Sequence, residues 1–134
     1  MKETKYIPGD LVMFKNPFEP SDTCVGIVKF LGNISDIILL CPYTNLNLEY
    51  FIKVENIQGI PITPEIIEKN GWKHACWSRY HKPAETNISL VFYQEEKAFF
   101  LFLYEQEISE TPIRYIHQLQ HLLFGLGMDS SMIV

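Results

Sequence analysis

The dipeptide Thr-Pro occurs twice in this chain, at positions 63–64 and 111–112, and each copy precedes an apolar pattern with helical spacing. Threonine can accept a hydrogen bond from the first unpaired amides of a helix, and proline loses no donor at the first helical position. The two dipeptides therefore predict helices that begin at Pro64 and at Pro112. We expect Gly71 to end the first helix in a left-handed conformation, and Gly125 and Gly127 to end the second.

Short apolar runs separated by turn residues fill the rest of the chain. Residues 11–14, 24–31, 36–41 and 48–57 predict strands at about ten-residue spacing, which is typical of a small barrel or a strongly bent sheet. The residues Gly-Asp-Leu-Val at 9–12, followed by a Gly-Ile-Val-Lys strand, resemble the opening of SH3-like barrels. The first part of the chain is therefore predicted to be an SH3-like β-rich half.

The second part of the chain predicts a different arrangement. Residues 72–80, 88–93 and 98–104 read as three strands, the last two joined by a charged hairpin turn at 94–97. The run 99–103 is apolar on both faces, as expected of a central strand that is covered on both sides. The fold class is therefore predicted to be α+β. An SH3-like half at residues 1–57 precedes an αβββα half at 58–134, whose helices cover one face of an antiparallel sheet, and the two could form one compact unit.

The composition limits the classes of function. Hydrophobic residues make up 47% of the 134 residues, so we expect an ordered globular protein. The formal net charge of −5 argues against a general nucleic-acid binder and leaves room only for a local basic patch. The polar start, the short apolar runs and three widely spaced cysteines predict a cytoplasmic protein with no membrane partner.

Two motifs carry a resemblance. Residues 57–72, IQGIPITPEIIEKNGW, and 115–122, YIHQLQHL, resemble motifs of short uncharacterised proteins of gut anaerobes and their phages, with a match over residues 54–126. This resemblance implies a phage or mobile-element origin, and hence a place in the host cytoplasm or in the virion. It implies no activity and no catalytic residues.

Paired histidines near the second helix are the first candidate metal ligands. His117 and His121 are four residues apart, the spacing that lets two imidazoles on a helix face one metal. Gln118 stands where zinc proteases of the His-Glu-x-x-His type carry their general base, so this motif cannot support that hydrolysis. Because both histidines are predicted to lie towards solvent, we expect ordinary surface histidines.

A second cluster contains the only thiol with nearby imidazoles. His74, Cys76 and His81 would suit zinc, and Cys76 with a histidine could form a nucleophile. His74 and Cys76 share a face if 72–80 is one strand, whereas His81 falls on the other. A buried thiol with partly exposed histidines is the favoured interpretation. We therefore expect no metal, no cofactor and no enzyme, and keep a zinc or thiol enzyme as the second alternative.

Aromatic and basic residues mix in the segment around residue 77. Lys73, Trp77, Arg79 and Lys82 have the composition of a platform on which single-stranded bases stack, and equally that of a half-buried strand with a protective lysine-rich edge. A nucleic-acid-binding module is therefore the first alternative function.

Surplus aromatic surface gives the main functional hypothesis. Such surface marks a partner site when its residues are exposed together. We expect a non-enzymatic protein-interaction or assembly protein of phage or mobile-element type, which acts as a homo-oligomer or as an adaptor. The residues expected to carry this interaction are Trp72, Trp77, Tyr80, Phe92 and Tyr93.

Overall fold

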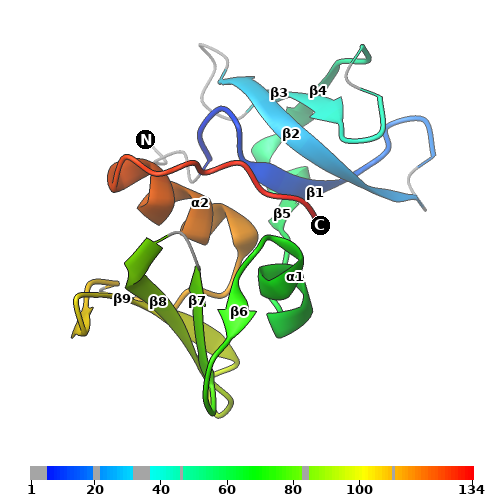
Figure 1. The fold of residues 1–134 in the computed structure, drawn as a ribbon. Coiled ribbons are helices and arrows are strands. Elements are labelled where there is room, and N and C mark those ends of the chain that lie inside the picture. The colour runs from blue at the N-terminus through cyan, green and yellow to red at the C-terminus, as the bar shows by residue number, and fades with distance from the viewer. Residues whose placement is uncertain (1–5, 20–21, 32–36, 46, 83–84, 110) are drawn as a thin grey trace. The chain divides into compact units, whose positions relative to one another are not determined.

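The computed structural model describes residues 6–19, 22–31, 37–45, 47–82, 85–109 and 111–134. The fold is a mixed α+β fold with two antiparallel sheets and two α-helices (Figure 1). The chain divides into two compact units, Met1–Ile60 and Pro61–Val134. The division lies three residues beyond the boundary expected from the sequence.

The first unit is a five-stranded sheet in which every neighbouring pair is antiparallel. The strand order is β4-β3-β2-β1-β5, and the sheet curls into a half-barrel (Figure 1). The predicted strand segments are confirmed to within one or two residues, although Asp36 lies outside the described residues and 48–57 is interrupted by a 3-10 turn. The elements are β1 (Leu11–Lys15), β2 (Thr23–Leu31), β3 (Ile37–Pro42), β4 (Tyr50–Lys53), η1 (Val54–Asn56) and β5 (Ile57–Gly59).

Alternate side chains of this first sheet form its core. A Cβ atom on Gly26 would lie 2.7 Å from Phe14 Cε1, so only glycine lets the Phe14 ring pack against β2. The ring is 2% exposed, and Val12 on the same strand is fully buried. The core residues are Tyr6, Val12, Phe14, Val28, Ile38, Leu40, Ile52 and Ile57.

The second unit contains a second antiparallel sheet, whose strands lie between the two α-helices in the sequence. Its strand order is β10-β9-β8-β7-β6, so each strand pairs with its neighbour along the chain. The elements are α1 (Pro64–Lys69), β6 (Lys73–His74), β7 (Arg79–Lys82), β8 (Glu85–Tyr93), β9 (Ala98–Leu103), β10 (Gln106–Glu107) and α2 (Ile116–Gly125).

One of the two predicted helix starts is confirmed. The Thr63 hydroxyl accepts a hydrogen bond from Ile66 N at 3.3 Å, Pro64 occupies the first turn, and Gly71 has φ +90° beyond the helix end. The start at Pro112 is wrong. Ile113 instead forms two backbone hydrogen bonds with Phe99, at 2.8 and 2.9 Å, so residues before 116 extend along the sheet.

The single strand predicted over 72–80 is also wrong. Residues 75–78 form a turn between β6 and β7, in which Ala75 N donates to Arg79 O and Arg79 N donates to Cys76 O. Trp77 has φ +50° in this turn. The chain therefore reverses direction where a continuous strand was expected, because these backbone hydrogen bonds stabilise a turn.

Candidate functional site

The second sheet has one buried face and one face that is only partly covered. Leu90, Phe99 and Leu101 are each 0% exposed, and they share one side of β8 and β9. Since side chains alternate along a strand, the residues between them point to the other side. We call this side the outer face; it carries Arg79, His81, Ser89, Val91, Tyr93, Phe100 and Phe102.

Aromatic side chains occupy much of the outer face. The Tyr93 and Phe100 rings meet edge to face, with centroids 4.8 Å apart. Tyr93 is 43% exposed, and Val91, Phe100 and Phe102 are half-buried. The prediction that 99–103 is covered on both faces is therefore wrong for Phe100 and Phe102, because the described residues leave their outer side partly open.

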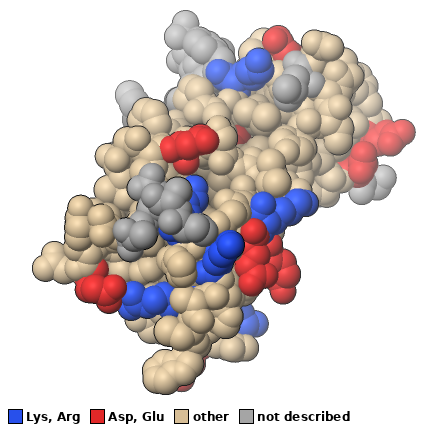
Figure 2. Space-filling view, in the orientation of Figure 1, with Lys and Arg blue, Asp and Glu red and all other residues tan. Residues whose placement is uncertain are grey.

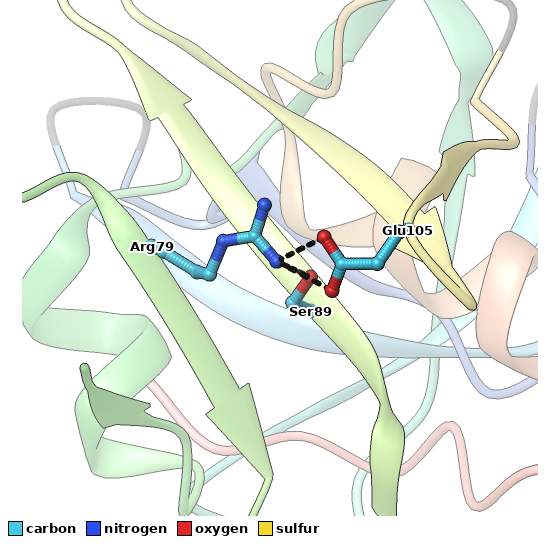
Figure 3. A network of polar contacts seen from close by, with 3 residues as sticks. All are labelled: Arg79, Ser89 and Glu105. Atoms are coloured by element: carbon cyan, nitrogen blue, oxygen red, sulfur yellow. Dashed lines mark hydrogen bonds and ion pairs between the residues drawn. The ribbon is translucent and has the colours of Figure 1, made fainter. Parts of the chain in front are cut away.

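A polar network lies beside these rings (Figure 3). Arg79 Nη1 donates to Glu105 Oε1 at 3.0 Å and Oε2 at 3.2 Å, and to Ser89 Oγ at 3.4 Å. The Arg79 guanidinium also lies 5.8 Å from the Phe102 ring centroid. The Arg79 and Glu105 side chains are 35% and 79% exposed, so water screens their ion pair and its contribution is about 0 to 1 kcal/mol.

Three turns around this sheet contain strained residues. Trp77, Lys97, Tyr104 and Glu105 all have positive φ, between 50° and 67°. For residues other than glycine a left-handed conformation costs about 1 to 2 kcal/mol each. Tyr104 and Glu105 form the two-residue turn from β9 to β10, a position at which glycine and asparagine are preferred. The strain at Glu105 is therefore larger than the stability that its ion pair supplies.

Only two of the five expected interaction residues are well exposed. Trp77 is 94% exposed and Tyr93 43% exposed, and the backbone bond from Phe92 N to Ser78 O brings them to the same end of the sheet. The other three are less accessible. Trp72 is 2% exposed, Tyr80 is 8% exposed, and Phe92 packs on Phe99 at 4.9 Å between ring centroids, on the buried face.

Phe100, Phe102 and the nearby Glu105 were not expected to belong to a site. Phe100 and Phe102 lie in a run predicted to be covered on both faces, although their alternation with Phe99 and Leu101 places them together on one side. Glu105 was not singled out, because its contact with Arg79 depends on the turn after β9. No pattern in the sequence indicates that a Tyr-Glu pair occupies a turn of this kind.

The four candidate nucleic-acid residues lie in different settings. Lys73 pairs in register with His81 and so shares the outer face with Arg79, whose guanidinium forms the ion pair with Glu105. Lys82 Nζ lies 5.5 Å from the centroid of the buried Trp72 ring, and Trp77 lies in the turn before β7. Among described residues on the face seen in Figure 2, blue Lys and Arg side chains alternate with red Asp and Glu side chains. This view therefore offers no continuous positive area for a phosphate backbone.

The candidate metal ligands lie in two separate places. His74 contacts the Trp77 carbonyl oxygen through Nε2, and its ring lies 5.0 Å from the Tyr80 ring. His117 and His121 have ring centroids 5.7 Å apart, but His117 is buried, contrary to the expected solvent position. Within the part of the chain that the structure describes, no three His, Cys, Asp or Glu residues are grouped to hold a metal ion.

The three thiols differ in accessibility. Cys76 is exposed in the turn before β7, contrary to the expected burial, and Cys41 is buried. Burial, followed by the charges of Asp22 and Glu19, raises the pKa of the Cys24 thiol. A raised pKa lowers the thiolate fraction, so Cys24 is a poor nucleophile.

The first unit also exposes aromatic side chains. Phe18 and Phe51 are 80% and 76% exposed, and the Phe18 ring lies 6.0 Å from the Tyr50 ring. A hollow of about 410 Å³ beside Phe51 is lined by Lys15, Asn16, Pro17, Phe51, Ile52, Lys53, Glu55 and Asn56. Its volume is within the range of small-molecule sites, but its lining is richer in charged residues than the mostly apolar lining that such sites have.

Comparison of the chain with protein-family models, with curated proteins and with solved structures finds no match. Among the described residues, no helix is both long and apolar enough to span a membrane.

Proposed function

We propose that this chain is a non-enzymatic interaction protein that associates with a second copy of itself through the outer face of its second sheet. The observation that carries the proposal is an aromatic sheet face that is partly open and has a charged pair at its side. Aromatic side chains and arginine are the residue types enriched in the buried centres of protein interfaces.

The backbone strain supports a use for this face beyond folding. Tyr104 and Glu105 hold left-handed conformations for an ion pair that water screens. A covering surface would remove that water and strengthen the attraction, provided that both charges keep partners. A partner that supplies charges opposite to those of Arg79 and Glu105 would therefore explain why Glu105 is held in a strained turn.

A second copy supplies such charges. In a two-fold interface the same patch is used on both sides, so a residue that contacts another makes the reciprocal contact as well. In the arrangement that we propose, Arg79 of each copy lies opposite Glu105 of the other copy. The aromatic side chains of Tyr93 and Phe100 form the apolar centre of the same patch.

Charge reversal tests this arrangement. We expect Arg79→Glu and Glu105→Arg each to weaken self-association about tenfold or more in sedimentation experiments, since each creates like-charge contacts. An equimolar mixture of the two variants should associate again, because each unlike pair of chains restores both contacts. Phe51→Lys, on an exposed aromatic of the other unit, is the control and should leave association unchanged.

Two outcomes would contradict the proposal. The unaltered chain could remain monomeric at millimolar concentration, or the mixture could associate no better than either variant alone.

The first unit is proposed to be SH3-like. This is supported by the strand order β4-β3-β2-β1-β5 and by the 3-10 turn that joins β4 to β5. The phage or mobile-element origin remains a proposal that rests on the resemblance of residues 57–72 and 115–122. A fold of this kind does not itself specify a partner.

Single-stranded nucleic acid is a second candidate partner, favoured by the exposure of Trp77. A base could stack on this ring, which is worth about 1 to 3 kcal/mol. Binding of an oligonucleotide that falls with salt and is lost in Trp77→Ala would support it, whereas binding unchanged in Trp77→Ala and Arg79→Ala would exclude it.

A further inference from the structure

The last residues of the chain are held against α1 by an asparagine that contacts their backbone. Asn70 Oδ1 accepts from Ile133 N at 2.8 Å, and Asn70 Nδ2 donates to Ile133 O at 2.7 Å. Nδ2 also donates to Ile66 O at 2.8 Å, which fixes the amide to the end of α1. The side chain of Asn70 thus contacts Ile133 as the backbone of a neighbouring strand would.

Two further polar contacts hold the same segment. Gln120 Nε2, on α2, donates to Ser130 O at 3.1 Å, and Lys69 Nζ donates to Val134 O at 2.9 Å. All of these bonds go to backbone oxygen or nitrogen of the segment. Such contacts do not depend on the segment's side chains, so they recognise an extended chain rather than a particular sequence.

One side chain of the segment is buried. Met132 is 7% exposed, whereas Ile133 is 43% exposed. Methionine is flexible and fills irregular apolar space well. The site therefore selects an extended segment with one apolar side chain between residues that remain accessible.

The connection to α2 allows the segment to move without breaking that helix. Gly127 has φ +73°, and residues 129–134 form no helix or strand. A segment attached by a glycine and held by one buried side chain and a few polar contacts opens at lower free energy than a paired strand.

We propose that residues 129–134 form an exchangeable strap, and that the site at Asn70 also accepts the strap of a second copy. Exchange of an identical element replaces each lost contact with the same contact from the other chain. This inference is independent of the outer face of the second sheet, because it uses residues of α1, α2 and the strap.

A labelled peptide of residues 127–134 tests the site in the full-length chain. In the Met132→Asp variant the chain's own strap should bind poorly, while the site itself stays intact. In the unaltered chain the strap competes with the peptide at high effective concentration. The peptide should therefore bind the variant about tenfold more tightly than the unaltered chain. Adding Asn70→Ala should reduce this affinity about tenfold. A peptide carrying Met132→Asp should not bind, whereas one carrying Ile133→Thr should bind as the natural peptide does.

Failure of Met132→Asp to bind the peptide, with an unchanged circular dichroism spectrum, would overturn the inference. Hydrogen exchange of the unaltered chain provides a test that needs no variant. We expect the Ile133 amide to exchange at least about tenfold faster than the Phe99 amide, because the strap opens without global unfolding. Equal protection of the two amides would show that the strap does not open separately, and the inference would fail.

Discussion

At the scale of single residues, Trp77 combines two unfavourable properties. Its side chain is 94% exposed, and its backbone is left-handed. Neither property helps the fold, which is why this tryptophan is better explained by a surface contact. The sequence could identify Trp77 as a candidate binding residue. It could not predict the turn at residues 75–78, because that turn depends on backbone hydrogen bonds between Ala75, Cys76 and Arg79.

Replacing Trp77 should separate stability from association. We expect Trp77→Gly to raise the free energy of unfolding by about 1 kcal/mol, because glycine adopts positive φ without strain. The same change should weaken self-association, since it removes an exposed aromatic at the end of the sheet where Tyr93 lies. Thermal denaturation and sedimentation measure the two effects. A variant that loses stability would show that the Trp77 ring supports the fold.

Tyr80 should make the fold sensitive to alkaline pH. Burial, then the charges of Glu68 and Glu65, raises the pKa of its hydroxyl above 10. The neutral form is favoured in the fold, so its contribution is complete below the unfolded pKa and is lost as pH rises past it. We expect Tyr80→Phe to lose less stability than the unaltered chain as the pH rises above about 10. Tyr104→Phe, at an exposed position, should behave like the unaltered chain in the same urea titrations.

At the scale of elements, the start of α2 shows why local patterns can mislead. Thr111-Pro112 has the residue types of a helix start, yet tertiary pairing of Ile113 with Phe99 keeps the chain extended. The helix begins at Ile116 instead, where Gln118 Oε1 accepts from Arg114 N at 2.8 Å and from Tyr115 N at 3.0 Å. Thr63-Pro64 meets no such competing strand, so the same signal was correct there.

This difference predicts unequal effects of two cap mutations. Gln118→Ala should lower the free energy of unfolding by about 1 kcal/mol, because two backbone amides lose their acceptor. Thr111→Ala, at the start expected from the sequence, should change it by less than about 0.5 kcal/mol. Urea denaturation of both variants measures this; an equal loss would mean that Thr111 stabilises the helix start after all.

The candidate site was predictable only in part. Tyr93 and Trp77 could be selected as aromatic residues near turns, and both are exposed. Phe100 and Phe102 are alternate residues of an apolar run, and the sequence cannot show whether one side of such a run is covered. Glu105 depends on a turn whose residues break the usual preference for glycine and asparagine.

At the scale of the whole molecule, the chain contains two compact units whose cores come from separate stretches of sequence. The sequence pattern changes near residue 60, from short strands to a capped helix, which is close to the point where the two units divide. The strand order of the first sheet could not be predicted from local patterns, because pairing of β5 with β1 joins residues more than forty positions apart, such as Phe14 and Ile57.

Expression of residues 61–134 alone should test the independence of the second unit. We expect cooperative thermal unfolding of this fragment, because Leu90, Phe99, Leu101 and Leu119 are fully buried and all lie within it. A domain of this size is only marginally stable, with about 3 to 5 kcal/mol from its core. A fragment that unfolds without a transition would show that the two units depend on each other.

Asn70 also has a chemical consequence that follows from its neighbour. Gly71 comes next in the chain, and asparagine followed by glycine is the pairing that most readily loses ammonia as a protein ages. The departing nitrogen is the one that donates to Ile66 O and Ile133 O, and a carboxylate in its place would repel both oxygens. Spontaneous deamidation of Asn70 would therefore weaken the attachment of residues 129–134 progressively as the protein ages.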